Sequence, residues 1–106
     1  MDQRDYVRRL LEAYRATPGT CGVVRRPDHL LAAQLHGRGV PIEAVENALV
    51  LAAARRLARP AGAPPLTMIR SLAYFLPVIE EVLALDVASE YFQHLRNRIA
   101  RLTSAS

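Results

Sequence analysis

Three side chains that can bind a metal ion or act in acid–base chemistry lie near one another in the sequence: Cys21, His29 and His36. A zinc site needs three or four converging ligands, usually at shorter fixed spacings than these three residues have. Cys21 and a histidine would make a nucleophile and its base, but no nucleophile elbow or cysteine-protease signature surrounds Cys21. The pattern predicts no metal site and no cofactor, and it favours surface positions for both histidines.

Two further patterns are weak catalytic signals. Glu80 and Glu81 are adjacent, so on a helix they point to different sides and do not form a converging carboxylate pair. The stretch TPGTCG, residues 17–22, lacks the Lys-Ser/Thr pair of a phosphate-binding loop and follows a predicted helix, where that motif requires a strand. We expect that the protein is not an enzyme.

The arginines carry the clearest chemical signal, because all 14 basic residues are Arg, the formal net charge is +4 and the pI is about 10.0. Acidic residues are missing from three stretches that contain arginines: 13–27, 47–79 and 91–106. Clustered arginines create a local positive potential that attracts phosphate groups. The candidate phosphate contacts are Arg25, Arg26, Arg55, Arg56, Arg59 and Arg70. A coding bias toward Arg is the alternative explanation for the missing Lys.

An aromatic pair accompanies the second cluster. Tyr74 follows Arg70 by one helical turn on the polar stripe of its segment, whereas Phe75 falls in an apolar row and is expected in the core. An exposed Tyr beside Arg stacks on a base or anchors a partner, or it only covers a bend in the helix. We include Tyr74 among the candidate nucleic-acid-binding residues.

Length and composition determine which elements can position these side chains. A chain of 106 residues, 51% hydrophobic and rich in Ala and Leu, predicts one helical domain over 1–106 with an all-α fold. Cys21 is the only cysteine, so an intrachain disulfide is excluded, and we expect a cytoplasmic protein. No apolar run is long enough for a membrane span, so no membrane partner is expected.

Apolar periodicity and helix-end signals predict about five helices in a compact bundle. The first runs from an N-cap at Asp2 to about Ala16, with Val7, Leu10, Leu11 and Tyr14 facing inward. The second runs from Pro27 to Gly37 and buries Leu30, Leu31 and Leu35. The third opens at Pro41 and continues until Pro60.

The fourth helix is predicted from about Thr67 and contains Pro77. Apolar residues at Ile69, Leu72, Leu76, Ile79 and Leu83 keep one phase across the proline, which favours one helix kinked at Pro77 over two helices. A break with a helix restarting at Pro77 is the alternative. The fifth helix is capped by Asp86 and runs to about Leu102, with Tyr91, Phe92, Leu95, Ile99 and Leu102 inward and a frayed tail at about 103–106.

Two motifs resemble the helical C-terminal part of phage, plasmid and DnaD-like replication proteins, over about half the chain. The first is a glycine turn that opens a helix, and the second is an apolar segment containing Ser, Tyr-Phe and Glu. The matching residues are Gly39, Val40, Pro41, Glu43 and Val45, then Ile69, Ser71, Tyr74, Phe75, Val78, Ile79 and Glu80. The resemblance implies a helical module that binds DNA with little sequence preference or docks onto replication machinery.

Two functional hypotheses follow. In the first, a small basic accessory protein of replication or of a mobile element binds nucleic acid, DNA rather than RNA, through arginine–phosphate contacts. In the second, the chain is a protein-interaction or self-assembly module that docks a replication or mobile-element protein, or another copy as a homo-oligomer.

Overall fold

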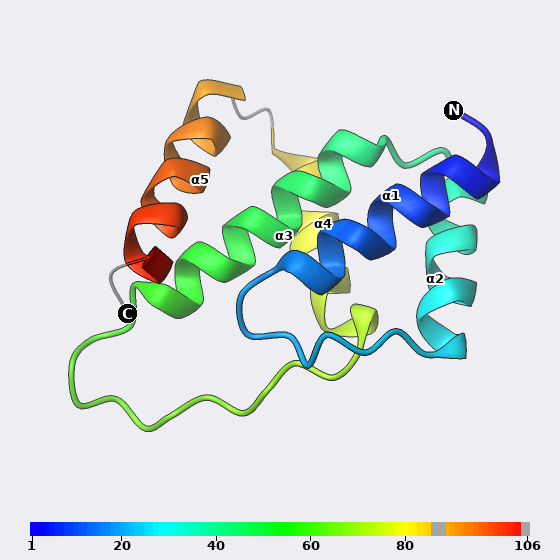
Figure 1. Cartoon of the computed structure of the whole chain (residues 1–106). Helices are drawn as coiled ribbons and strands as arrows, with labels where there is room; N and C mark the ends of the chain where they lie inside the picture. The colour runs from blue at the N-terminus through cyan, green and yellow to red at the C-terminus, as the bar shows by residue number, and fades with distance from the viewer. Residues whose placement is uncertain (86–88, 105–106) are drawn as a thin grey trace.

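The computed structural model describes residues 1–85 and 89–104, and over these residues the chain is all-α, as predicted (Figure 1). They form five α-helices and one 3-10 helix: α1 (Gln3–Ala16), α2 (Arg26–Gly37), α3 (Ile42–Leu57), η1 (Leu72–Phe75), α4 (Leu76–Ala84) and α5 (Ser89–Ser104). In the described residues, β-type pairing is limited to an isolated parallel bridge between Thr20 and Ile69. None of the described helices is both long and apolar enough to cross a bilayer.

Helix α3 is the centre of the fold, and it packs against α1, α4 and α5 (Figure 1). Its buried alanines, Ala48, Ala52 and Ala53, let neighbouring helices come close. Helix α2 lies against α1 and η1 instead. Polar side chains add links between helices: Arg9 of α1 donates two hydrogen bonds to Glu46 of α3, at 2.9 and 2.8 Å.

Helix α1 begins as predicted, because the Asp2 side chain accepts a hydrogen bond from the backbone N–H of Asp5 at 2.8 Å. Its buried residues are Tyr6, Leu10, Leu11 and Tyr14. Val7, which was predicted to face inward, is only partly buried. The hydroxyl of Tyr6 donates to the Val40 carbonyl at 2.8 Å and joins α1 to the turn before α3.

Helix α2 presents a different face to the core from the one predicted. Leu30 is 53% exposed and Leu31 is partly buried, whereas Ala32 and Leu35 are fully buried. The reason is Asp28, which is only 2% exposed because its carboxylate accepts backbone hydrogen bonds inside the fold. Burying Asp28 at the first turn aligns Ala32 and Leu35, four and seven residues later, with the core and turns Leu30 outward.

The prediction of one helix from about Thr67 is wrong. Residues before Leu72 are extended: Ile69 donates its N–H to the Gly19 carbonyl at 2.8 Å and accepts from the N–H of Cys21 at 2.9 Å. Helical structure starts as η1, and the α-helix begins at Leu76 with Pro77 in its first turn. A proline is tolerated there, because the missing N–H has no partner in the first turn of a helix.

The predictions for the third and fifth helices also need correction. Helix α3 ends at Leu57 rather than near Arg59. In α5, Phe92 and Leu95 are buried and Ile99 is partly buried, but Tyr91 and Leu102 are exposed, contrary to prediction. Thr103 and Ser104 belong to α5, so the frayed tail was predicted two residues too early, and the predicted cap Asp86 lies outside the described residues.

Candidate nucleic-acid interface

Two stretches without any acidic residue lie side by side along one edge of the molecule. The Thr20–Ile69 bridge joins segment 17–27 to segment 58–74, and both run along the lower edge in Figure 1. We call this surface, together with Arg56 at the adjoining end of α3, the basic edge. Its arginines and its exposed aromatic residue are Arg25, Arg26, Arg56, Arg59, Arg70 and Tyr74.

Arg56 connects the end of α3 to the extended segment. Its Nη2 donates to the Thr67 carbonyl at 2.8 Å, and its Nη1 donates to the Tyr74 hydroxyl at 3.3 Å. The guanidinium carbon lies 5.7 Å from the centre of the Tyr74 ring, within cation–π distance. Arg56 therefore orients the ring of Tyr74, which is 48% exposed.

Gly19 makes room for Arg56. Its φ of +94° lies in the left-handed region that side chains other than Gly rarely adopt. A Cβ atom at this position would lie 3.0 Å from Nε of Arg56. The glycine thus lets segment 17–22 approach both Arg56 and Ile69.

Arg55 and Arg59 differ in how much of their charge is available. Arg59 donates to the Pro64 carbonyl at 2.7 Å, which leaves its positive charge uncompensated because a carbonyl is neutral. Arg55 instead pairs with the carboxylate of Glu81 through both terminal nitrogens, one at 2.8 Å. The hydrogen bond from Arg55 lowers the pKa of Glu81 below its usual value, so the carboxylate stays ionised.

Four of the predicted site residues surround one hollow of about 260 Å³. Arg55, Arg56, Arg59 and Tyr74 line it together with the apolar side chains of Ala52, Leu66 and Val78. Guanidinium groups and an aromatic face around an apolar floor can hold a stacked base next to a phosphate. Arg70, which belongs to the same stretch without acidic residues, does not line this hollow.

The carboxylate of Asp28 brings together the two backbone segments that carry Arg25, Arg26 and Arg70. One oxygen of Asp28 accepts the Arg25 N–H at 2.9 Å, and the other accepts the Leu72 N–H at 2.9 Å. The carboxylate thereby holds the start of α2 beside the end of the extended segment. All three arginines are exposed, and within the described residues the side chains of Arg26 and Arg70 make no hydrogen bond or ion pair.

Cys21, His29 and His36 do not form a common site. Cys21 is partly buried next to the Thr20–Ile69 bridge, and His29 is exposed on α2. The His36 ring packs edge-on against Tyr6, with 5.1 Å between ring centroids, and is partly rather than fully exposed. In the part of the chain that the structure describes, no three Cys, His, Asp or Glu side chains gather around a potential metal position.

Two residues that shape the basic edge, Gly19 and Asp28, were not among the predicted site residues. Asp28 stands in the first turn of α2, and this position predicts interaction with the helix N-terminus. Its second bond, to Leu72, joins residues 44 positions apart, and no local pattern contains that information. Gly19 follows Pro18, which predicts a turn but not the approach of Arg56.

The likeness to replication proteins rests on the quoted motifs alone. No protein-family model, no curated protein and no solved structure matches this chain. The DnaD-like resemblance therefore stays a prediction.

Proposed function

We propose that the protein binds nucleic acid along the basic edge, through contacts of its arginines with phosphate groups. The observation that supports this best is the Thr20–Ile69 bridge, which aligns two arginine-containing stretches that lack acidic residues. Phosphate contacts supply most of the affinity in binding without sequence preference. DNA is the favoured partner, in agreement with the resemblance.

The charges on the edge support phosphate binding. Arg56 and Arg59 use carbonyl acceptors and keep their positive charge, while Arg26 and Arg70 extend into solvent. Five arginines, counting Arg25, are thus uncompensated by a carboxylate bound to their side chains. If each contacts one phosphate of a duplex, log affinity falls against log salt with a slope of about −4.5.

The hollow beside Tyr74 offers the nucleic acid a second kind of contact, base stacking, in addition to the phosphate contacts. A base that stacks on the exposed ring would be held within reach of Arg56 and Arg59, which line the same hollow. Stacking needs an unpaired base, so we propose that single-stranded DNA gains contacts that a duplex lacks. An accessory role in replication or in a mobile element is the biological setting that the resemblance implies.

Fluorescence anisotropy with a labelled oligonucleotide at several salt concentrations tests the proposal. The double variant Arg26→Ala/Arg70→Ala should weaken binding and reduce the duplex slope by about 1.8, because two phosphate contacts are lost. Folding stability should hardly change, since both side chains are exposed. The double variant Arg4→Ala/Arg8→Ala on α1 is the matched control, with the same change in net charge.

Three results would overturn the proposal: no binding at about 50 mM salt, binding with a flat salt response, or equal losses in the two double variants. The first two exclude an interface based on phosphates. The third would mean that binding follows the overall charge of the protein and not the basic edge. Light scattering with and without the oligonucleotide separates binding by a monomer from self-assembly.

A further inference from the structure

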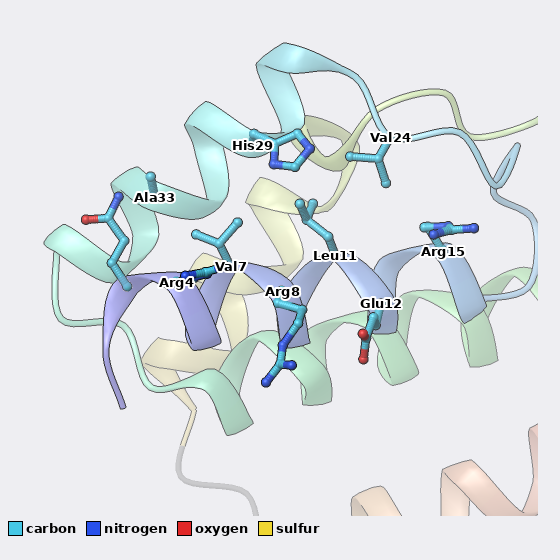
Figure 2. A pocket seen from close by; sticks show the side chains of 10 residues that line it. Arg4, Val7, Arg8, Leu11, Glu12, Arg15, Val24, His29 and Ala33 are labelled. Carbon is cyan, nitrogen blue, oxygen red and sulfur yellow. The ribbon is translucent and has the colours of Figure 1, made fainter.

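A second surface is a groove of about 760 Å³ between α1 and α2 (Figure 2), which adjoins segment 17–27 at Val24 but shares no arginine with the basic edge. Its floor is apolar. Val7 and Leu11 rise from α1, and they face Val24 and Ala33 on the α2 side. Leu11 is buried beneath the groove, whereas Val7, Val24 and Ala33 are partly exposed to it.

Arginines dominate the charged residues that line the groove. Arg4, Arg8 and Arg15 come from α1, and Glu12 is the one acidic lining residue among those the structure describes. Arg8 forms an exposed ion pair with Asp5 at 3.3 Å, and such a pair compensates little of the charge of Arg8. The side chains of Arg4 and Arg15 have no hydrogen bond or ion pair within the described residues.

We infer that this groove docks an amphipathic helix of an acidic protein partner. The lining residues of α1 extend from Gln3 to Arg15, which at the α-helical rise is a length of about 18 Å. This length matches about three turns of a docked helix. Apolar residues at i, i+3, i+4 and i+7 of that helix would fill the floor, and flanking Asp or Glu side chains would meet the arginines.

Charge complementarity decides between possible occupants. A second copy of this chain carries a net charge of +4, so its approach to a cationic rim is unfavourable. A lipid surface is flat and cannot reach a floor that lies between two helices. A helix with acidic flanks satisfies both the shape and the charge of the groove.

The inference is independent of the nucleic-acid proposal, because the two surfaces use different arginines. The groove uses Arg4, Arg8 and Arg15, whereas the basic edge uses arginines of segments 17–27 and 56–70. A partner helix in the groove therefore leaves Arg26 and Arg70 accessible. The protein would then connect an acidic protein to nucleic acid.

Amide chemical shifts of the ¹⁵N-labelled protein test this docking. The probe is a synthetic helical peptide of about 14 residues, with leucines at i, i+3, i+4 and i+7 and glutamates elsewhere on its surface. Its control is a peptide of the same composition in scrambled order. We expect shifts at residues of α1 and α2 that line the groove, with the scrambled peptide binding more weakly.

Two variants distinguish the groove from general charge attraction. Arg4→Ala/Arg15→Ala should reduce peptide affinity about fivefold, while Arg26→Ala/Arg70→Ala, with the same change in charge, should leave it unchanged. Ala33→Gln should also weaken binding by placing a longer polar side chain over the apolar floor, without a change in charge. Thermal melting of each variant confirms that the fold is retained.

The inference is overturned if the peptide causes no shifts up to about 1 mM, or if ordered and scrambled peptides bind alike. It is also overturned if both arginine pairs reduce affinity equally. Shifts of the groove amides on addition of the oligonucleotide alone would instead assign the groove to nucleic acid. Failure of DNA binding at the basic edge would leave the peptide result unaffected.

Discussion

The carboxylate of Asp28 accepts the backbone N–H of Leu72 at 2.9 Å, although the two residues are 44 positions apart. Its other oxygen accepts the N–H of Arg25 at 2.9 Å. A single buried side chain thus completes the N-terminus of α2 and supports the start of η1. The same two bonds hold the backbones that carry Arg25, Arg26 and Arg70 beside each other.

We predict that Asp28→Ala lowers the free energy of unfolding by about 3 kcal/mol, because the buried Leu72 N–H and the partly buried Arg25 N–H lose a charged acceptor. Urea denaturation measures the change, and hydrogen exchange of the Leu72 amide should accelerate. Asp5→Ala, which removes an exposed carboxylate in a surface pair with Arg8, is the control and should change stability by less than about 1 kcal/mol. Equal losses in the two variants would contradict the assigned role of Asp28.

Two buried tyrosines should respond in opposite ways to loss of the hydroxyl. Tyr6 is 3% exposed and donates to Val40, so Tyr6→Phe should destabilise the protein by about 1 kcal/mol. The hydroxyl of Tyr14 is fully buried without a hydrogen-bond partner among the described residues. Tyr14→Phe should therefore leave stability unchanged or raise it by about 1 kcal/mol. Thermal melts of the two variants and the unmodified protein measure both changes in stability. A marked loss of stability in Tyr14→Phe would reveal an interaction of that hydroxyl.

Stability should fall at alkaline pH. Burial raises the pKa of Tyr14 above its usual 10.0, with further increases from Asp28 and Cys21 and an opposing effect of Arg25. Burial, followed by Glu43, raises the pKa of Tyr6. The unfolded chain releases these protons near pH 10 while the folded chain retains them, so stability is complete below that pH and is lost above it.

The measurement is urea denaturation between about pH 8 and pH 11, with tyrosinate absorbance recorded in parallel. The decline should be smaller in Tyr14→Phe than in the unmodified protein, because one retained proton no longer contributes. A decline of equal steepness in both proteins would show that Tyr14 ionises in the folded state.

The sequence predicted the elements whose signals are local. Asp2, Pro27 and Pro41 stand at the start of three helices, and a helix-period apolar face follows each of them. The prediction of the buried face of α2 was wrong because Asp28 is a polar residue. Its burial depends on a hydrogen bond from the backbone N–H of Leu72, which is far away in sequence. Periodicity assigns such a residue to the surface.

The prediction for the segment before α4 was wrong for a related reason. Ile69, Leu72 and Ile79 are all buried, and their spacing fits a continuous helix as well as an extended residue followed by η1 and α4. What selects the second arrangement is the backbone pairing of Ile69 with Gly19 and Cys21, which is a tertiary interaction. The basic edge depends on this pairing too, so the sequence indicated the arginine clusters but not their alignment.

Pro77 provides a direct test of this difference. In a kinked helix, Pro77→Ala would stabilise the protein by restoring a hydrogen bond. In the first turn of α4, the ring already fits the backbone, and its replacement mainly increases the freedom of the unfolded chain. We predict that Pro77→Ala lowers the free energy of unfolding by about 0.5 kcal/mol, measured by chemical denaturation. Stabilisation by a similar amount would contradict the helix start at Leu76.

The ion pair between Arg55 and Glu81 should limit nucleic-acid binding. Both side chains lie on the surface, and Arg55 lines the hollow next to Tyr74 with its charge compensated. Glu81→Gln should release Arg55 for one more phosphate contact, which increases duplex affinity and steepens the salt slope by about 0.9. Stability should change by less than about 1 kcal/mol, because the pair is exposed.

Glu80→Gln is the matched control for this prediction, because it changes the net charge by the same amount at the neighbouring position. Glu80 pairs with Arg38 at 2.7 Å, beyond the end of α2, and neither residue lines the hollow. Its effect on affinity should be smaller, because the arginine that it releases, Arg38, is not one of the arginines of the basic edge. Anisotropy titrations of both variants on one duplex provide the comparison. Equal gains would reflect net charge alone, and no gain in Glu81→Gln would place Arg55 and its hollow outside the nucleic-acid footprint.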